Sequence, residues 1–177
     1  MRIILLLWVF HSLLFNANVP PTPDLPDVLL STKSVIRLYR GWNLVASPSN
    51  EAFPTTAITN VVGNDLYYFD SNEQNWKSGL GLFIEAGVGF WVNVSSDLTL
   101  SYNATPNNTY NLADLEVNPG WNLLGMSAET ERVFYIASLH NAKNLYIYDA
   151  SKSIWKEYAA YSRSSLKAGM GFWLETK

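Results

Sequence analysis

Tryptophan is the residue type in this chain best suited to a binding chemistry, because exposed indole rings stack on flat ligands such as sugars and peptides. The 177-residue sequence holds seven tryptophans, and six of them form equivalent pairs in two copies of one repeat. Trp76 and Trp155 lie beside polar turns, and with Tyr68 and Tyr158 they are the candidate ligand-binding residues. The alternative, which the repetition favours, is that each tryptophan anchors packing by burying about 150–250 Å².

Two motifs carry the repeat. Gly-Trp-Asn-Leu at 41–44 recurs at 120–123, and Gly-x-Gly-Phe-Trp at 87–91 recurs at 169–173. Equivalent positions lie 79 residues apart in the first part of the repeat and 82 apart in the last part. Glycine at such points permits a bulge or tight bend where an aromatic ring packs over bare backbone. We therefore expect structural repeat anchors at Trp42, Trp91, Trp121, Trp173, Gly41, Gly120, Gly89 and Gly171.

The remaining chemistry-bearing residues do not form a catalytic or metal-binding set. The Gly-x-Gly pairs lack the third glycine, the Lys-Ser/Thr pair and the following helix of a phosphate loop. The chain has no cysteine, and apart from His11 near the N-terminus its only histidine is His140. One histidine without cysteine does not make a metal cluster. The sequence therefore predicts no catalytic residues, no metal and no cofactor.

Carboxylates are harder to exclude as catalytic groups. Asp70 and Asp149 occupy equivalent positions, but each ends an expected strand and begins a polar turn. Aspartate at the start of a turn bonds its own backbone, which explains both residues without catalysis. Glu73 and Glu85 align with Lys152 and Lys167 in the second copy. We expect a non-enzymatic protein, with a glycan hydrolase as the least favoured alternative.

Composition and the N-terminus indicate an exported protein. The formal net charge is −3, and no basic cluster suits a nucleic acid. Residues 1–17 combine one arginine with an apolar run, as in a signal peptide. The run is shorter than the roughly 20 residues of a membrane span. The expected location is therefore secreted, periplasmic or cell-surface, with no stable membrane span in the mature chain. An uncleaved N-terminal anchor is the alternative.

The chain divides into two homologous modules. The expected domain boundaries are a signal peptide at 1–17, a proline-rich spacer at 18–33, a first module at 34–102, a linker at 103–111 and a second module at 112–177. Each module is mainly β, sandwich or barrel-like, with a short helix. Because a lone module of this size has a marginal core, we expect the two to pack with pseudo-twofold symmetry.

The expected elements follow the repeat. A hairpin is predicted around each Gly-Trp-Asn motif. Its strands are expected at 35–39 and 42–46 in the first copy, and at 112–117 and 121–126 in the second. Short helices are expected next, at 54–62 in the first copy and between Ser127 and His140 in the second. Aromatic runs at 66–69 and 145–148 predict strands that return through polar turns.

Two features occur in the first copy alone or near the linker. Residues 97–102 alternate polar and apolar, which predicts an extra strand that closes a sheet edge and covers the second copy. Three Asn-x-Ser/Thr sequons begin at Asn93, Asn103 and Asn107. In a eukaryotic secreted protein they are glycosylation acceptors.

The two motifs, with the central aromatic strand and its downstream tryptophan, resemble a tandem repeat of predicted bacterial and archaeal secreted or cell-surface proteins. The resemblance implies an extracytoplasmic β-rich module and supplies no catalytic residues. We therefore expect an exported structural or interaction module that assembles or adheres, with other surface proteins or itself as partners. The alternative is a carbohydrate-binding module that uses exposed tryptophan.

Overall fold

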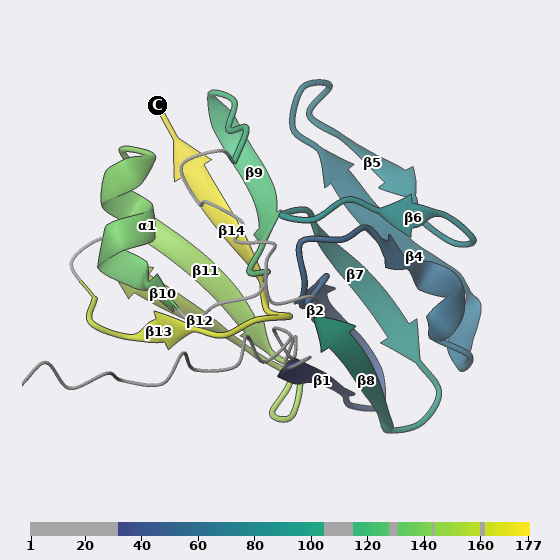
Figure 1. Ribbon diagram of the computed structural model, residues 1–177. Coiled ribbons are helices and arrows are strands. Elements are labelled where there is room, and N and C mark those ends of the chain that lie inside the picture. Colours follow the sequence, from purple (N-terminus) through teal and green to yellow (C-terminus); the bar gives the residue numbers. More distant parts are fainter. Residues whose placement is uncertain (1–31, 105–114, 128–130, 143, 160–161) are drawn as a thin grey trace, which may run out of the picture.

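The computed structural model describes residues 32–104, 115–127, 131–142, 144–159 and 162–177. These residues are mainly β-strand and form two groups of antiparallel strands that lie side by side (Figure 1). The fold class predicted from the sequence, two homologous β-rich modules, is confirmed. The predicted signal peptide, most of the spacer and most of the linker lie outside the described residues.

Each module is built on a four-stranded sheet of the same topology. In the first module the strand order is β2-β7-β4-β5. The strands are β2 (Gly41–Ala46), β4 (Val61–Asp70), β5 (Asn75–Ser78) and β7 (Gly89–Val94). In the second module the order is β9-β14-β11-β12. The strands are β9 (Gly120–Gly125), β11 (Asn144–Asp149), β12 (Ile154–Ala159) and β14 (Gly171–Thr176). Equivalent strands therefore hold equivalent places.

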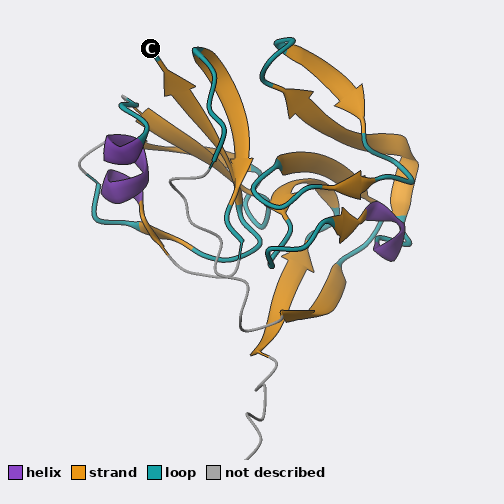
Figure 2. Ribbon diagram, turned by 45° about the horizontal axis from the view of Figure 1, so that its top comes forward, coloured by secondary structure: helices purple, strands orange, loops and turns teal. Residues whose placement is uncertain are grey.

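Smaller elements flank each sheet. Each module has a two-stranded ladder at an equivalent position. In the first module β3 (Phe53–Pro54) pairs with β6 (Phe83–Ile84), and in the second β10 (Glu131–Arg132) pairs with β13 (Ser165–Leu166). A third ladder, β1 (Thr32–Leu38) with β8 (Leu98–Ala104), occurs in the first module. The 3-10 helix η1 (Thr55–Ala57) and the helix α1 (Val133–Leu139) lie at opposite outer sides of the molecule (Figure 2).

The core of each module lies under one face of its sheet. Because side chains alternate along a strand, Phe90 and Val92 point to one face of β7 while Trp91 points to the other. Phe90 and its equivalent Phe172 are both fully buried, each in the aliphatic cluster of its own module. Phenylalanine and aliphatic residues fill these cores. The six paired tryptophans lie outside both clusters.

The Gly-Trp-Asn motif makes a sharp turn into β2 and β9. Gly41 and Gly120 both have a φ of 98°, a conformation that favours glycine. The buried Asn43 closes the turn, since its Oδ1 accepts from the Tyr39 amide at 2.8 Å and its Nδ2 donates to the Tyr39 carbonyl at 2.7 Å. Asn122 repeats both bonds, at 2.9 and 2.8 Å, with Asn118. The motif is thus a turn whose buried polar groups are satisfied.

The modules dock through backbone contacts that repeat under a pseudo-twofold axis. Bridges join Val45 to Met170 and the equivalent Leu124 to Val88. The Ala46 amide donates to the Gly169 carbonyl at 3.0 Å, and the equivalent Gly125 amide donates to the Gly87 carbonyl at 2.8 Å. The expected pseudo-twofold packing is confirmed by these matched contacts.

The second glycine of each Gly-x-Gly pair explains why the backbones approach so closely. A Cβ on Gly171 would lie 2.8 Å from the Val45 carbonyl oxygen, and one on Gly89 would overlap the Leu124 carbonyl oxygen. The bare backbone predicted at these glycines is present. The group packed over it is the backbone of the other module, however, and not an aromatic ring.

Two local predictions for the first module are wrong. The helix expected at 54–62 is a single 3-10 turn, because Thr55 bonds the Gly79 and Leu82 carbonyls and β4 already begins at Val61. The hairpin expected before Gly41 does not form: β1 pairs with β8, and β2 pairs with β7. The turn therefore passes the chain from one sheet to another.

The strand at 97–102 is present as β8, but its position differs from the prediction. Leu98, Leu100 and Tyr102 share one face as expected, and they pack on the core of the first module instead of covering the second. In the second module the part of 112–117 that the structure describes, 115–117, is not a strand. The helix expected after Ser127 is confirmed as α1, which begins later, at Val133.

Candidate functional site: two paired aromatic pockets

Each four-stranded sheet turns an aromatic face toward the other module. In the first sheet Leu44, Trp91 and Tyr67 stand in one cross-strand row. Phe69 and Trp76 form the next pair on the same face. The second sheet repeats the pattern with Leu123, Trp173 and Tyr146, and with Tyr148 and Trp155. Both faces of each sheet are therefore apolar, one toward its own core and one toward the partner module.

The aromatic faces line two open pockets related by the pseudo-twofold axis. Pocket A has a cavity volume of about 520 Å³ and is lined by Trp42, Tyr67, Trp76, Trp91 and Tyr148. Pocket B has a cavity volume of about 340 Å³ and is lined by Trp121, Tyr146, Trp155, Trp173 and Phe69. Each pocket takes four residues from one module and the fifth from the other. Neither module alone therefore forms a complete pocket.

Ring contacts join the pockets across the module boundary. The Trp91 ring lies 5.0 Å from Tyr148 and 5.6 Å from Trp155, measured between centroids. The equivalent Trp173 ring lies 5.1 Å from Phe69 and 5.6 Å from Trp76. Such tilted and edge-on pairs are favourable arrangements of aromatic quadrupoles, worth about 0.5–1.5 kcal/mol each beyond burial. They hold the rings of the two modules against one another across the boundary.

The outer rings of both pockets are exposed to solvent. Trp42 and Trp121 are each 39% exposed, Trp76 is 46% exposed and Trp155 is 51% exposed. Trp91 and Trp173 at the module boundary are partly buried. Soluble proteins rarely expose large apolar patches, and such patches mark interaction sites. The two equivalent sets of exposed indole rings are therefore candidates for an interaction site.

Polar side chains flank the pockets on the same sheet faces. Beside pocket A the Asn93 amide donates to Asp65 at 2.9 Å. Beside pocket B the Asn144 amide and the Tyr146 hydroxyl donate to Glu157 at 2.6 and 3.2 Å. These groups offer carboxylate acceptors and amide donors within a few residues of the exposed rings. The sequon residue Asn93 thus belongs to the surround of pocket A.

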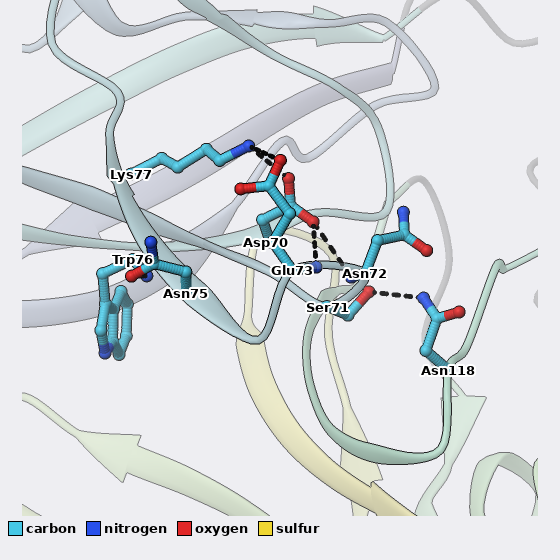
Figure 3. Close-up of polar contacts among 8 residues, drawn as sticks. All are labelled: Asp70, Ser71, Asn72, Glu73, Asn75, Trp76, Lys77 and Asn118. Atoms are coloured by element: carbon cyan, nitrogen blue, oxygen red, sulfur yellow. Dashed lines mark hydrogen bonds and ion pairs between the residues drawn. The ribbon is translucent and has the colours of Figure 1, made fainter.

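The hairpin turns beside the pockets hold the paired aspartates in a structural role. Asp70 Oδ1 accepts the Asn72 and Glu73 amides at 3.0 and 3.1 Å, and Lys77 reaches Asp70 at 2.6 Å and Glu73 at 3.0 Å (Figure 3). The Lys77 hydrogen bond and the backbone amides lower the pKa of Asp70. The prediction that Asp70 bonds its own turn is confirmed.

The second turn repeats this ion pair. Asp149 Oδ2 lies 2.7 Å from Lys156 Nζ, and Ser151 donates to Asp149 Oδ1 at 2.6 Å. The bonds from Lys156 and then Ser151 lower the pKa of Asp149 to about 2. The hydrogen bond to Asp149 raises the pKa of Lys156. Both aspartates are therefore charged turn anchors.

The turn of the first module also forms hydrogen bonds with the second module. Within the described residues, the turn of the second module forms no equivalent bonds with the first. Ser71 Oγ accepts from Asn118 Nδ2 at 3.0 Å (Figure 3), and Gln74 Nε2 donates to the Trp121 carbonyl at 3.1 Å. At the positions equivalent to Ser71 and Asn118 the chain has Ala150 and Tyr39. Pocket B is thus tied to the opposite hairpin by hydrogen bonds in addition to ring contacts.

The structure places two of the four ligand-binding residues predicted from the sequence in the pockets, one in each. Trp76 lies in pocket A and Trp155 in pocket B. Tyr68 and Tyr158 lie elsewhere, because both pack against the core clusters. The sequence reasoning missed Tyr67 and Tyr146. The available signal was alternation. It places Tyr67 on the opposite face of β4 from Tyr68, and Tyr146 on the opposite face of β11 from Ile147, so both tyrosines share a face with the motif tryptophans.

No group of three or more His, Asp or Glu side chains that would hold a metal occurs among the described residues. Within the same part of the chain, no helix is long and apolar enough to cross a membrane. No protein family, curated protein or solved structure matches this chain. The resemblance to tandem surface repeats therefore stays a prediction.

Proposed function

We propose that this protein is an exported, non-enzymatic recognition module that binds glycan chains through pockets A and B. The observation that carries the proposal is the pair of equivalent pockets whose indole rings are preorganised across the module boundary and left exposed. A sugar ring has an apolar face of C–H groups that stacks on an indole, and its hydroxyls need polar partners at the rim.

The size and surround of the pockets support this ligand class. Both cavity volumes fall in the range of about 300–1,000 Å³ that is typical of small-ligand sites. Asp65 with Asn93, and Glu157 with Asn144, provide the acceptors and donors that sugar hydroxyls require. The proposal assigns these carboxylates to binding, and the aspartates of the hairpin turns to structure.

Two linked pockets favour a polymer over a single sugar. Once one pocket is occupied, a second unit of the same chain reaches the other pocket at a high effective concentration. Binding of a long glycan is therefore expected to be tighter than binding of its short fragments. Adhesion to a polysaccharide surface is the biological role that such a module supports, in keeping with its apolar N-terminal segment.

A fluorescence titration tests the proposal. The full chain is mixed with the hexasaccharides of cellulose, chitin and xylan, and we expect at least one to shift the tryptophan emission in a saturable way. W76A and W155A should each weaken that binding about two- to tenfold, the loss expected for one aromatic contact. F83A is the matched control, because Phe83 is 70% exposed and outside both pockets.

Three outcomes contradict the proposal. Binding that W76A and W155A leave unchanged places the ligand elsewhere. A complete absence of binding to all three hexasaccharides removes the glycan assignment. Release of shortened oligosaccharides during incubation makes the protein an enzyme and overturns the non-enzymatic part.

A further inference from the structure

Two more cavities lie between the modules, and they form a second pseudo-symmetric pair. The basic groove, of about 540 Å³, is lined by residues that include Ile36, Arg37, Asp149, Lys156, Lys167 and Gly169. The acidic groove, of about 450 Å³, is lined by residues that include Asp70, Glu85, Gly87, Leu115, Glu116 and Leu124. Each groove draws residues from both modules, as the aromatic pockets do.

The grooves carry opposite charge at equivalent positions. Arg37 of the basic groove corresponds to Glu116 of the acidic groove, and Lys167 corresponds to Glu85. All four side chains are exposed, and none makes an ion pair within the described residues. The other charged residues of the linings, Asp70 and the Asp149–Lys156 pair, are already neutralised by an ion pair.

A projecting hairpin turn borders each groove and continues the inversion. The turn after β4 borders the acidic groove, and its Asp70 and Glu73 share the single cation Lys77, which leaves this turn a net negative charge. The turn after β11 borders the basic groove, and beside its Asp149–Lys156 pair it carries Lys152 at the position equivalent to Glu73, which leaves it a net positive charge. The two turns project from opposite ends of the molecule (Figure 1). At one end of the molecule the turn with Lys152 and the neighbouring groove are both basic. At the other end the turn with Glu73 and the neighbouring groove are both acidic.

We propose that copies of this chain associate head to tail, with the acidic end of one copy against the basic end of the next. The turn with Glu73 enters the basic groove near Arg37 and Lys167, and the turn with Lys152 enters the acidic groove near Glu85 and Glu116. Complementary charge at both contacts fixes the partner and its orientation. Because the two surfaces differ, the contact is heterologous, and repetition gives a ring or an open filament.

Charge-reversal variants measured by sedimentation velocity and light scattering test the contact. The full chain should form oligomers whose mass rises with concentration up to about 1 mM. The mass should fall as salt is raised from about 0.05 M to about 0.5 M, because salt screens the charges. R37E/K167E makes both grooves acidic, and E85K/E116R makes both grooves basic. Each variant alone should self-associate at least about tenfold more weakly than the wild type.

The decisive measurement is an equimolar mixture of the two variants. One variant retains an intact acidic groove and the other an intact basic groove, so the mixture should recover a complex that neither forms alone. Recovery also shows that both variants are folded.

The proposal is overturned if the wild type is monomeric throughout the concentration range, or if the variants associate as the wild type does. It is also overturned if the mixture stays monomeric while both variants keep the wild-type thermal midpoint. If the wild type is monomeric and binds heparin, and R37E/K167E does not bind it, the basic groove is instead a site for an anionic polymer. None of these changes touches Trp76 or Trp155, so the glycan titration separates failure of this contact from failure of the proposed function.

Discussion

The two modules are most alike where they face one another and most different where they face outward. Trp42 and Trp121 share the same exposed fraction, and the ring contacts of Trp91 are reproduced by Trp173 to within a fraction of an ångström. The exposed charged positions of the two grooves diverge: Arg37 corresponds to Glu116, and Lys167 to Glu85.

This contrast follows from pseudo-twofold packing. A contact between two positions in different modules recurs with the modules exchanged, as Trp91 with Tyr148 recurs as Trp173 with Phe69, so similar residue types suit both copies. A position on the outer side meets only solvent or a partner, and each copy is free to differ there. Shared residues therefore report on docking and pocket formation, and divergent residues report on what distinguishes one end of the molecule from the other.

The largest expected effect comes from the two core phenylalanines. F90A and F172A should each destabilise the protein by about 3–5 kcal/mol, because each empties a fully buried site. The backbone contacts between modules make the unfolding cooperative, so urea denaturation should show one transition in both variants. F83A, at an exposed site, should change stability by less than about 0.5 kcal/mol. Two separate transitions would mean that the modules fold independently.

The sequence predicts the local parts of this fold well. Alternation and turn chemistry locate the hairpins β4–β5 and β11–β12, and Asp70 is correctly assigned to its turn. These features depend on neighbours close in sequence, which a single chain displays directly.

Which apolar face forms the core was not predictable from alternation. In β7 both Phe90 and Trp91 are apolar, so the pattern does not say which of them meets the core and which meets the other module. The pockets were not predictable for the same reason, because the contact between Tyr148 and Trp91 exists only when the two modules are docked. The partner of β1 was misjudged for a similar reason, because the choice between β2 and β8 depends on tertiary contacts.

The next effect concerns the glycines at the module contact. G89A and G171A should each cost about 1–3 kcal/mol, because the added methyl group pushes against a carbonyl oxygen of the other module. Gly89 is the tighter site, so G89A should be the more destabilising of the two in thermal denaturation. The control is G63N, since Gly63 has a φ of 54°, which asparagine tolerates, and open space around it. Wild-type stability in both alanine variants would show that the backbones are not in close contact.

A smaller effect distinguishes the two hairpin turns. S71A removes the bond from Asn118 and should cost about 0.5–1.5 kcal/mol. The reciprocal change, A150S, places a hydroxyl at the equivalent turn, where Tyr39 stands in place of Asn118, and should leave stability unchanged. Thermal midpoints of the two variants measure the difference. An equal response would show that the polar tie to pocket B contributes nothing to docking.

The smallest expected effect is the pH dependence of the turn ion pairs. Because folding lowers the pKa of Asp149 from 3.8 to about 2, its carboxylate stabilises the folded state above pH 4, and this contribution disappears as the pH falls from about 4 through about 2. Asp70, whose pKa is also lowered, should act in the same direction. The effect is small because both pairs lie at the surface.

The two aspartates should nevertheless respond differently to amidation. D149N should lower the thermal midpoint at pH 7, because it removes the charge that binds Lys156, and the difference from the wild type should shrink strongly as the pH falls to about 2, the folded-state pKa of Asp149. D70N should cost less, since an asparagine oxygen still accepts the Asn72 and Glu73 amides and Lys77 keeps Glu73 as a partner. A D149N difference that persists unchanged at pH 2 would show that packing of the turn, not the charge of Asp149, sets its stability.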